Sequence, residues 1–194
     1  MPITALDPDS ALIVVDVQKG HAGARLVHPL EGVVERSATL AAAFRERTLP
    51  VVLVSVAGAP PGRTDAAPNG PSGDSLPEGY ADLMPELNVH GDDMLVVKHA
   101  RSAFAGTSLA EKLRGLGVTQ VVITGVTTGS GVESTARDAH DQGFNVTVAL
   151  DAMSDTDAGR HEHSVAKVFP RIAETGTAQD VLDALPSAFG GTAR

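Results

Sequence analysis

The sequence predicts an α/β fold built on a parallel β-sheet. Its 194 residues contain five short apolar runs rich in β-branched side chains, at 11–15, 50–56, 93–99, 119–126 and 145–150. Each run is apolar on both faces, which is typical of strands buried in a parallel sheet. Stretches with helical patterning separate the runs, and strands that alternate with helices form right-handed βαβ units.

The expected helices cover five stretches, at 30–47, 107–116, 132–142, 158–173 and 178–185. Thr107 is an N-cap candidate, because its hydroxyl can accept a hydrogen bond from a free N–H group at the start of a helix. Gly117 and Gly143 follow two of the expected helices. Glycine adopts the left-handed conformation that ends helices, so these residues predict helix ends.

Segment 57–92 breaks this alternation, because it carries six prolines and six glycines and has only one short candidate for a helical turn. A loop of this length is either a tolerated surface insertion or a functional element, such as an active-site lid or a subunit-contact arm. The chain shows no repeat and no second composition regime, so we expect residues 1–194 to form a single domain.

Composition excludes several classes of function. With 15 Lys and Arg against 24 Asp and Glu, the net charge of −9 argues against nucleic acid as a partner. The apolar runs are far shorter than the roughly 20 residues that cross a membrane, and the first residues lack a signal-peptide pattern, so we expect a cytoplasmic protein. The chain has no cysteine, which excludes disulfides, thiolate metal sites and thiol nucleophiles.

Polar residues follow several of the expected strands, where a parallel sheet binds ligands. Asp16 follows the first run, Lys98 closes the third, and a glycine-rich turn at 125–132 follows the fourth. Burial would raise the pKa of Asp16 and a nearby ammonium would lower it, so the two residues predict either a structural ion pair or a proton-transfer pair. The turn predicts an anion site or a simple corner. We expect Asp151, after the fifth run, to bond local backbone.

Three motifs, ALIVVDVQKGH, the stretch from VVKHARSAF to VALDAMSD, and VFPRIAETGTAQDVL, resemble the isochorismatase-like, or cysteine hydrolase, superfamily. The resemblance implies a three-layer, Rossmann-like sandwich with a six-stranded parallel sheet, assembled as homodimers or homotetramers. Amidase members of the superfamily use an Asp, a Lys and a Cys. By motif, Asp16 and Lys98 match the first two, and Gly131 stands at the Cys position.

True isochorismatases resemble this chain in having Gly at that position. The implied mechanism is non-covalent: Asp16 protonates an enol ether, Lys98 tunes and orients the acid, Gly131 leaves room, and water captures the oxocarbenium ion. Ser130 is adjacent but points roughly 100° away around a helix axis, which argues against it as a nucleophile. The resemblance also implies a cis peptide between Val126 and Thr127.

The remaining site candidates are substrate-binding residues near these motifs: Gln18, Arg101, Phe104, Thr127, Thr128 and Ser130. Three have plain alternatives: Gln18 as a helix or loop cap, Arg101 as a surface cation and Phe104 as core. No metal or other cofactor is expected, because the metal-binding histidines of nicotinamidases have no counterpart after the second run. His161 and His163, spaced i, i+2, lie on different helix faces and are expected to be solvated.

Two functions follow from these observations. The first is a hydrolase of isochorismatase type, acting on a small, anionic metabolite without a cysteine nucleophile. The second is a catalytically inactive relative that binds a small molecule or serves as an oligomeric scaffold. The presence of both Asp16 and Lys98 favours the enzyme, because a scaffold has no need of a buried ion pair that is costly to desolvate.

Overall fold

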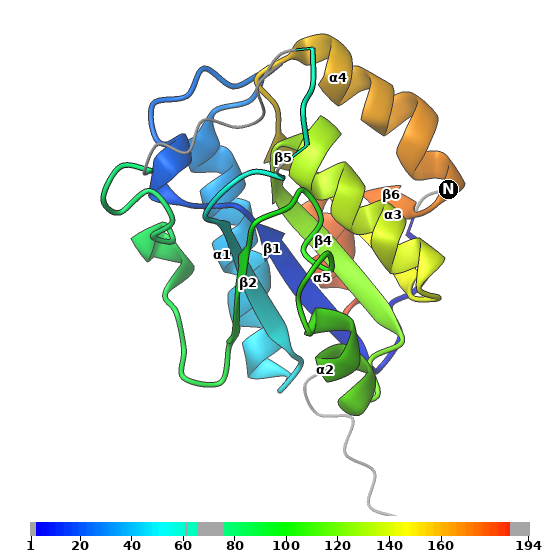
Figure 1. Ribbon diagram of the computed structural model, residues 1–194. Coiled ribbons are helices and arrows are strands. Elements are labelled where there is room, and N and C mark those ends of the chain that lie inside the picture. The colour runs from blue at the N-terminus through cyan, green and yellow to red at the C-terminus, as the bar shows by residue number, and fades with distance from the viewer. Residues whose placement is uncertain (1–2, 61, 66–75, 187–194) are drawn as a thin grey trace, which may run out of the picture.

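The computed structural model describes residues 3–60, 62–65 and 76–186 and contains a six-stranded parallel sheet. Its order is β3-β2-β1-β4-β5-β6, with helices on both faces (Figure 1). The strands are β1 (Ser10–Val15), β2 (Val51–Val56), β3 (Met94–Lys98), β4 (Gln120–Val126), β5 (Asn145–Ser154) and β6 (Glu174–Gly176). The predicted α/β fold is therefore confirmed.

The strand order places a switch point between β1 and β4. From β1 the chain builds outward through β2 to β3 and then returns to β4 on the other side of β1. The loops after β1 and β4 leave the sheet in opposite directions, and in folds of this kind the carboxyl ends of two such strands are where ligands bind. Asp16 and the glycine-rich turn after Val126 both lie at this edge of the sheet.

Each face of the sheet is covered by helices that pack on alternate strand residues. On one face, Leu12 and Val14 of β1 pack with apolar residues of α1 (Leu30–Glu46) and α5 (Ala178–Ala184). On the other, Ile13 and Val15 share a core with α2 (Leu109–Gly115) and α3 (Glu133–Asp141). This alternation, with period two, makes β1 apolar throughout and produces the three layers visible in Figure 1.

Gly117 and Gly143 follow the ends of two helices, as predicted. Gly117 and Gly143 have φ values of 76° and 87°, in the left-handed region. The residue before α2 is Ser108, with no side-chain cap, while the Thr107 hydroxyl donates to the Ala103 carbonyl at 2.6 Å. Its oxygen also lies 3.4 Å from the Leu109 N–H, so Thr107 contributes one position earlier than a strict N-cap.

The last third of the chain differs most from the prediction. The expected helix at 158–173 is divided into α4 (Ala158–His163), a π-helical turn (Ser164–Val168) and a 3-10 turn (Phe169–Arg171). Pro170 lies in that last turn and has no N–H to continue a helical ladder. β6 follows, a strand of three residues without an apolar run, so its own residues gave no strand signal.

Candidate active site

Asp16 and Lys98 form a buried ion pair at the carboxyl edge of the sheet. Lys98 ends β3 and reaches across β2, so that its Nζ lies 2.7 Å from Asp16 Oδ2. Only 2% of Lys98 and 4% of Asp16 is exposed. Lys98 also donates to the backbone carbonyl of Arg101 at 2.6 Å, which fixes the direction of its ammonium. The predicted meeting of these two side chains is confirmed.

The carboxyl of Asp16 has one engaged oxygen and one free oxygen. Among the described residues, Oδ1 is buried and has no hydrogen-bond partner. Burial raises the pKa of Asp16 to about 6, and this effect outweighs the attraction and hydrogen bond of Lys98, which lower it. A carboxyl with that pKa exchanges its proton near neutral pH, and Oδ1 is the atom at which it can do so.

Gly131 brings the turn after β4 onto this pair. A Cβ built on Gly131 would lie 3.0 Å from Asp16 Oδ2 and 3.4 Å from Lys98 Nζ. Any side chain at this position would therefore press on both members of the pair, and glycine avoids this crowding. The three residues for which we predicted catalytic roles thus meet at one point, while their roles remain predictions.

The path of this turn depends on two backbone features. The peptide bond between Val126 and Thr127 is cis, as the resemblance implied. Gly125 has a φ of 120°, and a Cβ there would overlap the backbone carbonyl of Val15 on β1. Only glycine fits at such a close approach of two strands, so Gly125 has the clearest steric requirement of the glycines near the site.

The N–H groups of the turn are mostly engaged within the protein. The N–H groups of Ser130 and Val132 donate to the Thr127 carbonyl, each at 3.1 Å, and Gly129 N–H donates to Asp155 Oδ2 at 2.7 Å. These donors are therefore not free for an anion. Of the two interpretations of the turn, the corner is the one that these contacts favour.

Gln18 has a structural set of contacts. Its side-chain amide donates to the carbonyls of Val56 and Tyr80, and its oxygen accepts from Val56 N–H. The side chain is fully buried, and its backbone pairs with Leu83. These bonds tie the loop after β1 to segment 57–92 and use both amide hydrogens, so they favour a loop anchor over a substrate-binding residue.

The other substrate-binding candidates are divided between site and core. Thr127 and Ser130 are half-buried on the turn, and Arg101 is exposed beside Lys98. Thr128 is buried, and its hydroxyl lies 2.9 Å from His161 Nδ1. Phe104 is buried in the core, with its ring stacked on Phe144 at a centroid distance of 6.0 Å, which supports the core interpretation of this residue.

Two expectations about the end of β5 are wrong. β5 continues past Leu150 to Ser154, because its pairing with β4 shifts register and then resumes. Asp151 therefore lies within the strand, where it pairs with Arg36 at 3.0 Å and accepts from Ala178 N–H, both distant in the sequence. The acid that follows β5 is Asp155, whose side chain is fully buried against the turn.

His161 was expected to be solvated, and it is buried. Its side chain bonds to Thr128 on the turn after β4, and its ring makes an edge contact with His28 at 5.1 Å between centroids. The imidazole is therefore packed against that turn. Burial and His28 lower its pKa. The spacing of His161 and His163 correctly excluded a shared face, because His163 is exposed, but the packing of α4 on the turn could not be read from spacing.

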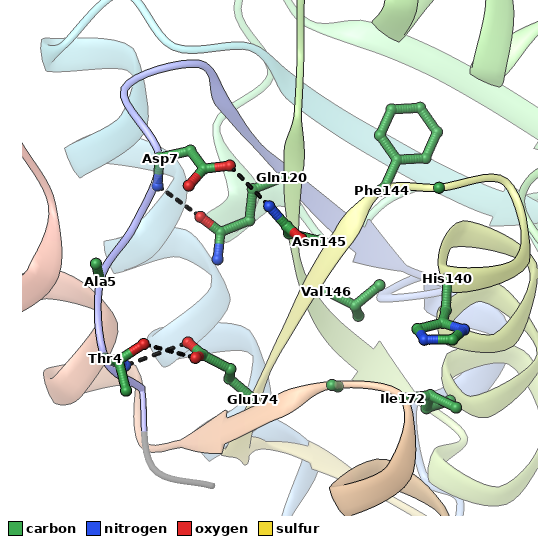
Figure 2. Close-up of a pocket in the computed structure, with 12 residues that line it drawn as sticks. Thr4, Ala5, Asp7, Gln120, His140, Phe144, Asn145, Val146, Ile172 and Glu174 are labelled. Carbon is green, nitrogen blue, oxygen red and sulfur yellow. Dashed lines mark hydrogen bonds between the residues drawn. The ribbon is translucent and has the colours of Figure 1, made fainter.

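A separate pocket of about 540 Å³ opens at the opposite, amino-terminal edge of the sheet (Figure 2). Its polar groups bond one another: Asp7 N–H donates to Gln120 Oε1, Asn145 donates to Asp7, and Thr4 donates to Glu174. These mutual bonds indicate a structural role for the polar groups of the pocket.

Within the described residues, no cluster of His, Asp or Glu is arranged to hold a metal ion. No described helix is long and apolar enough to span a membrane.

Comparison with known proteins identifies the family. Residues 10–180 match the isochorismatase domain. An uncharacterized isochorismatase family protein of Escherichia coli O157:H7, YecD, is 37% identical over 91% of this chain and 96% of its own. A maleamate amidohydrolase of Pseudomonas putida is 28% identical over 90% and 86%. The structure of an isochorismatase family protein from Burkholderia thailandensis has a TM-score of 0.86 and 37% identity, covering 93% of this chain and 97% of that one. The chain belongs to the isochorismatase family.

Proposed function

We propose that this isochorismatase-family hydrolase cleaves a small, anionic metabolite by acid–base chemistry of Asp16 and Lys98, without a cysteine nucleophile. The observation that supports this most strongly is the Asp16 carboxyl. It is buried, its pKa is about 6, one oxygen is held by Lys98, and the other has no partner among the described residues. A merely structural ion pair would have no reason to leave a buried oxygen without a hydrogen bond.

Asp16 acts as the general acid. It gives its proton to the terminal carbon of an enol ether, and water then captures the resulting oxocarbenium ion. Lys98 stabilises the carboxylate that remains after proton transfer, at a distance of 2.7 Å. General acid catalysis of this kind contributes about 10²–10⁴-fold in rate.

Gly131 provides the space for the reacting group. Because a Cβ at this position would lie 3.0 Å from Asp16 Oδ2, glycine lets substrate or water approach the acid closely. The chain contains no cysteine, so an acyl-enzyme on a thiol is excluded whatever the substrate.

Anion selectivity is assigned to the cations of the site. Lys98 and Arg101 lie at the same edge, and the guanidinium side chain of Arg101 is exposed while its carbonyl holds Lys98. Charges of this sign focus a carboxylate on the crevice although the net charge of the chain is −9.

A ligand screen tests the proposal. Thermal shifts with isochorismate, chorismate, small amides and small carboxylates would identify binders, and product analysis would identify turnover. We expect an enol ether with a carboxylate to be cleaved, and Asp16→Asn to lower turnover by at least about 10²-fold while binding survives. Asp141→Asn, at an exposed position, is the matched control.

Two results would contradict the proposal. Turnover at the wild-type rate by Asp16→Asn would reject the acid, and loss of turnover in Ser130→Ala would identify a nucleophile that the proposal excludes. Binding without turnover of any compound would favour the inactive binder or scaffold, in which substitution of Asp16 changes only stability.

A further inference from the structure

His21 lies beside the acid, although its position in the sequence gave no signal. It ends a 3-10 turn, Lys19–His21, that is separated from the end of β1 by three residues. Asp16 adopts a φ of 53°, and the chain then folds back so that His21 Nδ1 lies 2.9 Å from the Asp16 backbone carbonyl. The imidazole is thus held against the backbone of Asp16, whose side chain is the proposed acid.

This contact determines the tautomer of the ring. A carbonyl oxygen can only accept a hydrogen bond, so Nδ1 carries the hydrogen. In the neutral imidazole Nε2 then has no hydrogen and presents a lone pair. Among the described residues, no hydrogen bond joins Nε2 to the protein, and His21 is half-buried, so this lone pair is available to a proton.

The surroundings keep the ring neutral. Burial lowers the pKa of His21, the Asp16 carbonyl raises it, and the positive charge of Lys98 lowers it further. The Tyr80 ring packs against the imidazole at 6.3 Å between centroids and over Gly20, where a Cβ would lie 2.6 Å from that ring. Nearby in the described chain, Lys19 pairs with Asp82 at the surface. The charged groups toward the site are Lys98, the Asp16 carboxyl and, exposed at the same edge, Arg101.

We infer that His21 Nε2 is the general base that accepts a proton from the attacking water, completing the acid–base pair of the proposed hydrolysis on which this inference rests. Asp16 first gives its proton to the enol-ether carbon, and the C=C electron pair forms the new C–H bond. Water then adds to the oxocarbenium carbon through an oxygen lone pair. The O–H bond that breaks sends its proton to Nε2.

The cycle closes without another reagent. The hemiketal loses its alcohol when the C–O bond breaks, and the imidazolium returns its proton to the leaving oxygen. The hydroxyl proton of the hemiketal goes to the Asp16 carboxylate as the C=O bond forms. Asp16 and His21 thereby regain their starting protonation states.

Asparagine separates the two roles of His21. In His21→Asn the side-chain amide can still donate to the Asp16 carbonyl, as Nδ1 does, but the proton-accepting nitrogen is gone. His21→Phe removes both functions and keeps a planar ring. His163→Asn, at an exposed position of α4, is the matched control. The readouts are kcat/KM against pH, with isochorismate as the probe, and the tautomer of His21 by ¹⁵N NMR of the full-length protein.

The wild type is expected to show a bell-shaped profile. Its alkaline limb is set by loss of the Asp16 proton near pH 6, and its acidic limb by protonation of His21. In His21→Asn we expect kcat/KM to fall by about 10²-fold and the acidic limb to disappear. A residue with only a structural role would lower the whole profile and keep both limbs.

The failures of the two proposals are distinguishable. An active wild type with His21→Asn unchanged, or with its acidic limb intact, overturns the role of His21 and leaves that of Asp16 standing. An Nε2–H tautomer overturns the role of His21 without any substrate. A wild type that cleaves none of the screened compounds, or an Asp16→Asn variant that cleaves its substrate fully, overturns the proposed function and the inference with it.

Discussion

The balance between burial and Lys98 at the Asp16 carboxyl makes a quantitative prediction. With a pKa of about 6, roughly one Asp16 in eleven carries its proton at pH 7. At the reference pKa of 3.8 the proportion would be only one in about 1,600. The net effect of burial and Lys98 therefore increases the acid form at neutral pH by roughly 150-fold, which is the contribution of the fold to the proposed chemistry.

Replacing Lys98 by methionine tests this balance directly. Methionine retains much of the length of the side chain but removes the charge and the hydrogen bond at 2.7 Å, both of which lower the pKa of Asp16. We therefore expect the pKa of Asp16 to rise above 6. Because the acid form is the active one, the alkaline limb of kcat/KM moves to higher pH, although a weaker acid lowers the maximum rate.

The assay is a ¹³C NMR titration of aspartate carboxyl groups, with Asp16→Asn to assign the resonance. Lys167→Met, at an exposed position of the π-helical turn after α4, is the control and should leave the titration unchanged. A titration midpoint that stays in place or moves to lower pH in Lys98→Met would refute the reasoning, because it would show that the ammonium does not stabilise the carboxylate.

Four further predictions follow from the site and its supports. In Gly131→Cys the new thiol adjoins Asp16 and Lys98, so mass spectrometry should show faster alkylation by iodoacetamide than in Ser130→Cys; equal rates would contradict the geometry. Gln18→Ala should lower the free energy of unfolding by about 2–4 kcal/mol in urea, because buried backbone partners lose their bonds. Gly125→Ala should cost about 4 kcal/mol or more, and soluble protein with wild-type stability would refute the steric requirement. Sedimentation should give the mass of a dimer or tetramer at micromolar concentration, and a monomer would contradict the expected assembly.

The two charged residues of the site could be predicted from the sequence because each stands at the end of an apolar run. Strand ends in a parallel sheet share one edge, so the sequence brings Asp16 and Lys98 together without knowledge of their packing. The same rule failed for β5. Its apolar run stops at Leu150 while the strand continues, so the rule pointed to Asp151 in place of Asp155.

The other site contacts that the sequence did not predict join segments that are distant in the sequence or depend on an unusual backbone conformation. Gln18 bonds to Tyr80, which is 62 residues away, and Thr128 bonds to His161, which is 33 residues away. His21 and Asp16 are only five residues apart in the sequence, but their contact depends on the left-handed conformation of Asp16. An aspartate after an apolar run gives no sign of that conformation, so the fold of this short turn had to come from the structure.

The glycine at position 131 also matters for the codon that encodes it. Some glycine codons become cysteine codons by a single base change, and a Cβ at this position would lie against Asp16 and Lys98 once these side chains shift by a few tenths of an ångström. For a codon of that kind, one point mutation separates this chain from a scaffold that carries a thiol beside an acid and an ammonium.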